Sequence, residues 1–314
     1  MVAAFAAAAI VVTAGVVIYQ RGGVDLPNQA YCEAVVGDRT VRLDPDQARY
    51  ASLIAALGVQ RGLPARAVTI ALATAYQESK ISNLGYGDRD SLGLFQQRPS
   101  QGWGTRTQVR DPVYATETFY TALEQVEGYR DLPVEVAAQR VQRSADGSAY
   151  AQHETSARPL ASALTGYSAA SFTCVVASPP ATDQTPQPNG LTPAAEAVRR
   201  EVAVAFGRLP SGGYAPGGVA SGHSAGSAHY DGRAIDYFFR PVDAENTRRG
   251  WALAHFLVAN AGRLGVGTVI FDDRIWTARR SGEGWRAYEP GTDADDPGTA
   301  AVLRHLDHVH VDVA

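Results

Sequence analysis

The most regular alternation of polar and apolar side chains lies near the C-terminus, along residues 308–313. Every second side chain there is polar: His308, His310 and Asp312. The intervening valines face the other way in a strand, because successive strand residues point to opposite sides. Buried imidazoles need hydrogen-bonding partners, so we expect the valine face to join the core and the histidine face to border a polar site.

A second strand with a polar group on one face is expected between Gly232 and Phe239, a stretch rich in β-forming residues. On one face of it lie Ala234, Asp236 and Phe238. The other elements expected in this half are helices over residues 192–206 and 246–261 and strands over 266–271 and 274–277, with a turn at Asp272-Asp273. Helices packed on one antiparallel sheet predict an α+β fold for residues 191–314.

Residues 30–177 show a different pattern, mainly helical with a small β hairpin. Strands are expected at residues 31–36 and 40–43 around a turn at Gly37-Asp38, and residues 172–177 form a third β-like run. Asp44-Pro45 is a strong helix start, because a capping residue is followed by proline, and this helix is expected to reach Gln60. A second helix is expected from Pro64 to Lys80.

Residues 178–190 join the two halves and contain repeated prolines with almost no apolar side chains. Such a composition favours an extended, semi-rigid spacer. At 314 residues the chain is long enough for two domains, each with its own core. We therefore expect one domain over residues 30–177 and another over residues 191–314.

The N-terminus from Val2 to Tyr19 is apolar apart from Thr13 and Gly15. As a helix, a run of this length spans about 27 Å, just enough for the hydrocarbon core of a bilayer. Residues 1–23 are therefore predicted to be a single-pass membrane anchor, with a cleaved export signal as the alternative. The expected location is the cell membrane with the domains outside the cytoplasm, or secretion after cleavage.

Cys32 and Cys174 lie at the two ends of the first predicted domain. In an exported chain such a pair is expected to form one disulfide, and the alternative is two free buried thiols. The net charge of −4 is small and the sequence contains no basic run. Binding to nucleic acid is therefore not expected.

Residues 227–236 read Ser-Ala-His-Tyr-Asp-Gly-Arg-Ala-Ile-Asp, and a His-Val-His segment follows at 308–310. These residues resemble the zinc D-Ala-D-Ala carboxypeptidase family, whose metal fold is shared by hedgehog-type signalling domains. The family pattern, Ser-x-His-x-x-Gly-x-Ala-x-Asp and then His-x-His, is matched at every fixed position, and the resemblance covers residues 191–314. It implies a peptidase domain in which zinc is held by His229, Asp236 and His310. Two imidazoles and one carboxylate are typical zinc donors, although such a set can also hold non-haem iron.

The family often has a glutamate as general base three residues before the last zinc histidine. Asp307 occupies that position here and is the favoured base, although strand alternation would turn it away from His310 unless the strand begins after it. His308 is the second candidate for the base. Further candidates for steadying water or substrate are His223, Ser227 and His305.

Gln77-Glu78-Ser79 ends the second predicted helix, and Gly93-Leu94-Phe95-Gln96 follows a glycine-containing loop. These two segments resemble soluble lytic transglycosylases and goose-type lysozymes over residues 44–167, with phenylalanine in place of the usual methionine. The resemblance implies a lysozyme-like domain in which Glu78 is the acid that cleaves a glycosidic bond. The expected sugar contacts are Ser79, Gln96, Gln97, Trp103 and Tyr120.

A glutamate at a helix end beside an apolar wall can remain protonated and donate to the leaving oxygen. A transglycosylase needs only this carboxyl, whereas a two-carboxylate hydrolase needs a partner, for which Asp88 or Asp90 is available. Both mechanisms stay open, as does a domain that only binds glycan.

Peptidoglycan contains both glycosidic bonds and peptide bonds between D-amino acids. The two resemblances together predict a bifunctional peptidoglycan hydrolase that uses zinc and touches the membrane through its N-terminal helix. The alternative is a non-catalytic wall-binding or scaffold protein with a structural zinc.

Overall fold

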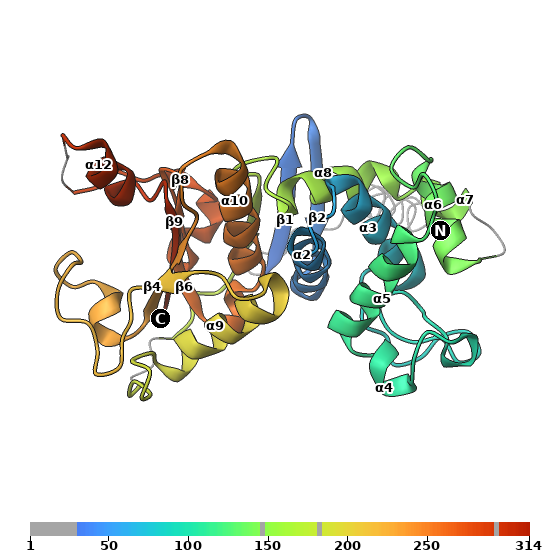
Figure 1. Cartoon of the computed structure of the whole chain (residues 1–314), viewed down its shortest axis with the longest axis horizontal. Coiled ribbons are helices and arrows are strands. Elements are labelled where there is room, and N and C mark those ends of the chain that lie inside the picture. The colour runs from blue at the N-terminus through green and yellow to red at the C-terminus, as the bar shows by residue number, and fades with distance from the viewer. Residues whose placement is uncertain (1–29, 145–147, 181–183, 292–294) are drawn as a thin grey trace, which may run out of the picture. The chain divides into compact units, whose positions relative to one another are not determined.

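The computed structural model describes residues 30–144, 148–180, 184–291 and 295–314, which form two α+β regions (Figure 1). A mainly helical region precedes residue 178, and a region built on an antiparallel sheet follows residue 190. The predicted membrane segment, residues 1–23, lies outside the described residues. Within the described ranges, no helix is both long and apolar enough to cross a bilayer.

A small antiparallel sheet of order β2-β1-β3 belongs to the helical region. Its strands are β1 (Tyr31–Val36), β2 (Arg39–Leu43) and β3 (Phe172–Val175). Gly37 supplies a left-handed residue, with φ of +61°, in the turn between β1 and β2. Cys32 lies opposite Cys174 across the β1–β3 pair, and the two form a disulfide. The predicted hairpin, third strand and disulfide are therefore confirmed.

Two predicted helices lie in the core of this region. α2 (Pro45–Gln60) starts at Asp44, whose carboxylate accepts from the backbone amide of Gln47 in a capping box. α3 (Ala65–Ser79) ends at Lys80, whose φ of 57° is left-handed and stops the helix. α2, α5, α6, α7 and α8 all pack against α3.

The other helices described in this region are shorter than α2 and α3. They are η1 (Pro99–Gln101), α4 (Arg106–Val109), α5 (Pro112–Glu124), α6 (Val134–Gln142), α7 (Ser148–Ala151) and α8 (Glu154–Leu164). α5 begins as α2 does, with a capping aspartate followed by proline. The helical segments surround α3 and bury its apolar side chains.

The second region is built on an antiparallel sheet of order β4-β5-β9-β6-β7-β8. Its strands are β4 (Ser211–Gly212), β5 (Ala234–Phe238), β6 (Val266–Phe271), β7 (Arg274–Thr277), β8 (Arg286–Ala287) and β9 (His308–Val313). Asp272 and Asp273 both have left-handed φ angles, 50° and 57°, which suit a two-residue hairpin turn. The predicted strands and turn are confirmed, and β9 lies between β5 and β6.

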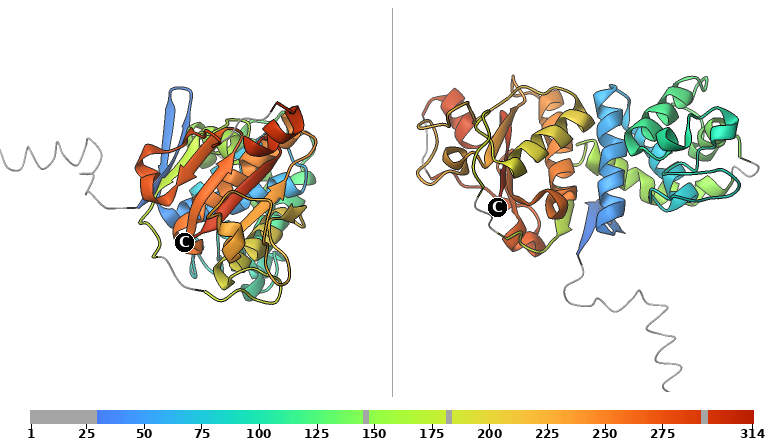
Figure 2. Two further views of the ribbon diagram at one scale, coloured as in Figure 1. Left: turned by 90° about the vertical axis from the view of Figure 1, so that its left-hand side faces the viewer. Right: turned by 90° about the horizontal axis from the view of Figure 1, so that it is seen from below.

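One face of this sheet packs on α9 (Pro193–Phe206) and α10 (Ala244–Ala259), and the other face is free of these helices. The side chains toward the helices are buried and mostly apolar: Tyr237, Val269, Trp276, Val309 and Val311. The left view of Figure 2 looks onto the opposite face, which carries the histidines of β9. Short helical segments complete the region: η2 (Ala228–Asp231), α11 (Ala261–Leu264), η3 (Ala278–Glu283) and α12 (Pro297–Leu303).

α10 also joins the two regions, because it packs against α2 and α8. Nδ1 of His255 on α10 donates to the carbonyl oxygen of Ala163 at 2.8 Å, and Asn260 donates to the Ser52 hydroxyl at 3.3 Å. Residues Tyr31–Ala314 therefore form one compact unit. The described residues of the predicted linker contain neither helix nor strand.

Candidate metal centre

The segment 227–236 folds into a tight turn followed by β5. Ser227 caps η2, and its hydroxyl accepts from the backbone amide of His229 at 3.4 Å. Gly232 ends the turn with φ of +67°, and a Cβ there would lie 2.2 Å from the carbonyl oxygen of Gly190. Because only glycine fits this position, local sterics explain how the motif holds His229 on the turn and Asp236 on the strand.

His229, Asp236 and His310 converge on one point. Asp236 and His310 are direct neighbours across the β5–β9 pair. Nε2 of His229 lies 3.1 Å from Nδ1 of His310, which lies 3.0 Å from Oδ1 of Asp236. The same Asp236 oxygen lies 3.3 Å from Nε2 of His229. The three donor atoms therefore form a nearly equilateral triangle.

This triangle matches the size of one face of a tetrahedral zinc site. Zinc–nitrogen distances of about 2.0–2.1 Å place neighbouring ligand atoms of a tetrahedron about 3.3–3.4 Å apart. The donor spacings of 3.0, 3.1 and 3.3 Å lie close to that value. Three protein donors leave one position of the tetrahedron for water or substrate, which is the composition of a catalytic zinc site.

The second nitrogen of each imidazole has an acceptor nearby. Nδ1 of His229 donates to the carbonyl oxygen of Gly213 at 2.8 Å, and a Cβ at Gly213 would lie 2.3 Å from the His229 ring. Nε2 of His310 lies 3.8 Å from a carboxylate oxygen of Asp312. Such acceptors orient metal-binding imidazoles and determine which nitrogen is left for the ion.

The charges around the donors favour a cation at this point. Burial alone would lower the pKa of His310, but Asp236 and Asp312 outweigh it and raise this pKa to about 9. Burial would raise the pKa of Asp236, but hydrogen bonds from His229 and His310 hold that pKa far below its usual range. A divalent ion would supply the positive charge that the two carboxylates stabilise, so this donor set fits a metal such as zinc.

Asp307 is bound at both carboxylate oxygens. Oδ1 accepts from Nδ1 of His308 at 2.7 Å, and Oδ2 accepts from Nε of Arg240 at 2.6 Å. Burial would raise the pKa of Asp307, but these two partners outweigh burial and lower it. Nε2 of His308 lies 3.8 Å from Oδ1 of Asp236. The imidazole of His308 therefore lies between Asp307 and the donor triangle.

The donors line a pocket of about 790 Å³, and the glycine-rich residues 222–228 also line it. The ring of His223 stacks on that of His229 at 3.9 Å, and donor atoms of His223, His229 and Asp236 lie within 4.8 Å of one another. These three residues could also hold a metal ion. His305 packs against His308, with 4.6 Å between ring centroids, and burial together with the neighbouring histidines lowers the pKa of His305 to about 3.

In the helical region, Glu78 lies at the end of α3 and accepts a hydrogen bond of 2.6 Å from the Tyr150 hydroxyl. Tyr150 on α7 is only 1 % exposed. Burial, and then the Glu78 carboxylate, raise the pKa of Tyr150, so its hydroxyl stays a donor. The sequence offered Ala149-Tyr150-Ala151 only as an unclear match to the tyrosine motif of the lysozyme-like family, and it did not pair Tyr150 with Glu78, which lies 72 positions away.

The residues predicted to contact sugar beside Glu78 have different positions. Tyr120 and Gln97 are 0 % and 1 % exposed, and each donates to a backbone carbonyl of the core. They present no surface to a ligand, so their assignment as sugar contacts is corrected to a packing role. Ser79 is also buried and donates to a backbone carbonyl, whereas Gln96 is partly exposed.

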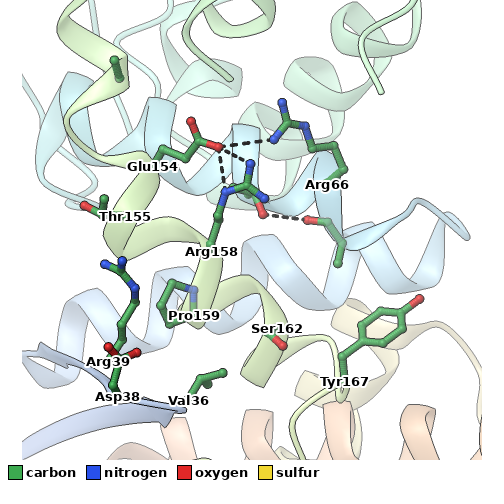
Figure 3. A pocket seen from close by; sticks show the side chains of 13 residues that line it. Val36, Asp38, Arg39, Arg66, Glu154, Thr155, Arg158, Pro159, Ser162 and Tyr167 are labelled. Atoms are coloured by element: carbon green, nitrogen blue, oxygen red, sulfur yellow. Dashed lines mark hydrogen bonds and ion pairs between the residues drawn. The ribbon is translucent and has the colours of Figure 1, made fainter. Parts of the chain in front are cut away.

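Figure 3 shows a separate pocket of about 740 Å³ in the helical region, lined by residues of the β1–β2 hairpin, α3 and α8. Glu154 is paired there with Arg66 and Arg158. Glu78 is not among the described residues that line it. The structure therefore does not connect this pocket with the predicted catalytic acid.

Comparisons with known proteins bear mainly on the second region. A family described as the VldE C-terminal domain, which is related to peptidase domains, matches residues 187–298. The matched range includes His229 and Asp236 and ends before His308 and His310. A search of curated proteins found no match.

Proposed function

We propose that this chain is a zinc-dependent peptidase that cleaves peptide bonds between D-amino acids in peptidoglycan, with a glycan-cleaving activity in its helical region. The observation that carries the proposal is the triangle of His229 Nε2, Asp236 Oδ1 and His310 Nδ1. The motif that supplies these residues resembles the zinc D-Ala-D-Ala carboxypeptidase family. The match to a family related to peptidase domains also supports it.

His229, Asp236 and His310 are the residues that would hold the zinc ion. Bound there, zinc supplies Lewis-acid chemistry that polarises a peptide carbonyl and activates water. The outer acceptors, Gly213 and Asp312, would keep the two imidazoles in the orientation that binding requires. His223, which stacks on His229, is a candidate for contact with the substrate from the glycine-rich wall.

His308 is the proposed general base. Its Nδ1 is hydrogen-bonded to Asp307, so Nε2 is the nitrogen left to accept a proton. Asp307, paired with Arg240, would orient the ring and stabilise the imidazolium after the proton is accepted. This assignment reverses the preference drawn from the sequence, in which Asp307 was the favoured base.

Glu78 is the proposed acid for glycan cleavage. The Tyr150 hydroxyl holds one oxygen of its carboxyl group and so orients it. Asp90, one of the two candidates for a second carboxylate, is bound by Arg98 and Ser100. That engagement makes Asp90 a poor partner for Glu78, so a two-carboxylate hydrolase would need Asp88, whose side chain is exposed. Because peptidoglycan carries both kinds of bond, the two activities would share one substrate outside the cytoplasm.

Mass spectrometry of purified cell wall digested by the zinc-loaded full chain tests both activities. We expect shortened stem peptides and glycan fragments from the wild type. His310→Ala should lose zinc and peptide cleavage but keep glycan cleavage, because Glu78 lies in the other region. Glu78→Gln should show the opposite result. Zinc content measured on protein purified without chelator distinguishes zinc from iron.

A wall-binding protein with a structural zinc is the second candidate. The observation that favours it is the engagement of Asp307, which leaves neither carboxylate oxygen free to act on water. Identical peptide fragments from wild type and His310→Ala would contradict the peptidase and favour this reading. In that case removal of zinc should lower the melting temperature without changing the digestion products.

A further inference from the structure

A second pocket lies beside the metal centre on the same face of the sheet. Its volume is about 1260 Å³, and it shares Arg233 and Asp312 with the pocket of the metal centre. The strand register shows that five residues lining this pocket lie on the face of the sheet that carries His310: Thr268, Ile275, Thr277, Arg286 and Asp312. The two pockets are therefore neighbouring parts of one open sheet face.

One row of paired residues crosses this face from the metal centre to the second pocket. Its members in order are Asp236, His310, Ile270, Ile275 and Arg286. Neighbouring strands lie about 4.8 Å apart, so the backbone of Arg286 is about 14 Å from that of His310. An extended peptide, which rises about 3.3 Å per residue, covers this distance in about four residues.

Four of the residues that line the second pocket are arginines: Arg233, Arg279, Arg280 and Arg286. Two of them have acidic partners, since Arg233 pairs with Asp231 and Arg280 pairs with Glu283. Asp312 adds one carboxylate to the lining.

Neither Arg279 nor Arg286 forms a salt bridge within the described ranges of the chain, although the Glu283 carboxylate, which pairs with Arg280, also interacts electrostatically with Arg286. Nη2 of Arg286 donates to the Thr277 hydroxyl at 2.9 Å, but its buried Nε has no hydrogen-bond partner among the described residues. A buried donor without a partner destabilises a protein until a ligand supplies an acceptor. An anionic oxygen is the acceptor that a guanidinium binds most strongly.

We propose that the second pocket binds a carboxylate of the peptide substrate through Arg286 and Arg279 while the scissile bond lies at the metal centre. This inference rests on the proposed peptidase function and adds a substrate class. The substrate is an extended peptide with a free acid about four residues from the cleaved bond. The two isoleucines of the row, Ile270 and Ile275, form the apolar floor between the two sites.

Direct titration of two synthetic peptides into the zinc-loaded full chain tests the proposal. The peptides share one cleavable bond between D-amino acids, and they differ only at the fourth residue from it, which carries an acid or the matching carboxamide. Wild type should bind the acid at least about tenfold more tightly, as expected for a hydrogen bond to a charged group. Arg286→Gln should abolish this preference, and Arg279→Gln should reduce it.

Arg274→Gln is the matched control, because Arg274 is exposed on β7 and lines neither pocket. It should keep the wild-type preference, and all variants should keep the wild-type zinc content. Arg279 is exposed, so Arg279→Gln serves as the test if Arg286→Gln does not fold. Equal affinity of wild type for both peptides, or binding of neither, overturns the proposal. Preferential binding of the acid without cleavage contradicts the peptidase function instead and leaves the carboxylate pocket standing.

Discussion

Asp307 and His308 are adjacent in the chain but make different contacts. His308 has one nitrogen on Asp307 and the other near Asp236, whereas both oxygens of Asp307 are already bound. Asp307 is one methylene shorter than the glutamate of the family pattern. Because both of its oxygens are bound, its proposed role is to position His308 and not to act on water itself.

Asp307→Asn tests this positioning role. The amide keeps the size of the side chain but removes the negative charge that stabilises the imidazolium of His308. We expect kcat/KM for peptide cleavage to fall about tenfold to a hundredfold with zinc content unchanged, as is typical for partners of site residues. His308→Gln should abolish cleavage, also with zinc retained. An Asp307→Asn enzyme that keeps full activity would show that Asp307 is not needed to position the base.

At the scale of elements, the metal centre depends on a glycine of the loop after β4 whose backbone lies close to the His229 ring. Gly213 directly follows β4, with φ of +79°, and its carbonyl accepts from His229. Gly217, in the same loop, has a similar φ of +82°, but a Cβ there would meet nothing within 4 Å. An alanine at either position would be strained by the left-handed φ. Only at Gly213 would its methyl group also collide with other atoms.

Gly213→Ala and Gly217→Ala therefore form a matched pair. The first should weaken zinc binding by at least about tenfold, because the methyl group would displace the His229 ring and its hydrogen bond. The second should leave zinc affinity unchanged. Competition with a chelator measures both. Equal weakening by the two substitutions would mean that loop strain, and not the position of His229, controls zinc affinity.

At the scale of the whole molecule, α10 is shared by the sheet and the helical region. His255 lies at this contact with no exposed surface, and its Nδ1 donates to the carbonyl of Ala163. Desolvation by burial lowers the pKa of His255 to about 4. A neutral imidazole is thus part of the packing that joins the two regions.

This histidine predicts an acid-sensitive contact. The pKa of an unfolded histidine is about 6.5, so between that value and the folded pKa of about 4 only the unfolded state binds the proton. The stability that the neutral, buried His255 contributes is fully present above the unfolded-state pKa. It is lost as the pH falls from there toward the folded-state pKa. Urea unfolding at pH 7 and 4.5 measures how much stability each protein loses in acid, and this loss should be smaller in His255→Asn than in wild type by about 2 kcal/mol. An equal loss in both proteins would contradict this role of His255.

Local patterns in the sequence were enough to predict many individual elements. The capped start at Asp44, the turn at Asp272-Asp273 and the alternation along residues 308–313 depend on neighbours within a few positions, and the structure has all three. The spacing of residues 227–236 likewise reflects local sterics, since Gly232 must adopt a left-handed φ. The same spacing supplied two of the three donors, His229 and Asp236, and the separate His-Val-His segment supplied the third, His310.

Only the tertiary structure decided which distant groups meet. It brought the Tyr150 hydroxyl to Glu78 and the Arg240 guanidinium to Asp307. It also aligned Arg286 in a row with His310 and buried Tyr120 inside the core. These outcomes depend on strand order and helix packing, in which β9 enters between β5 and β6. Short-range periodicity determines which side of an element is polar, but it carries no information about the element that the polar side will face.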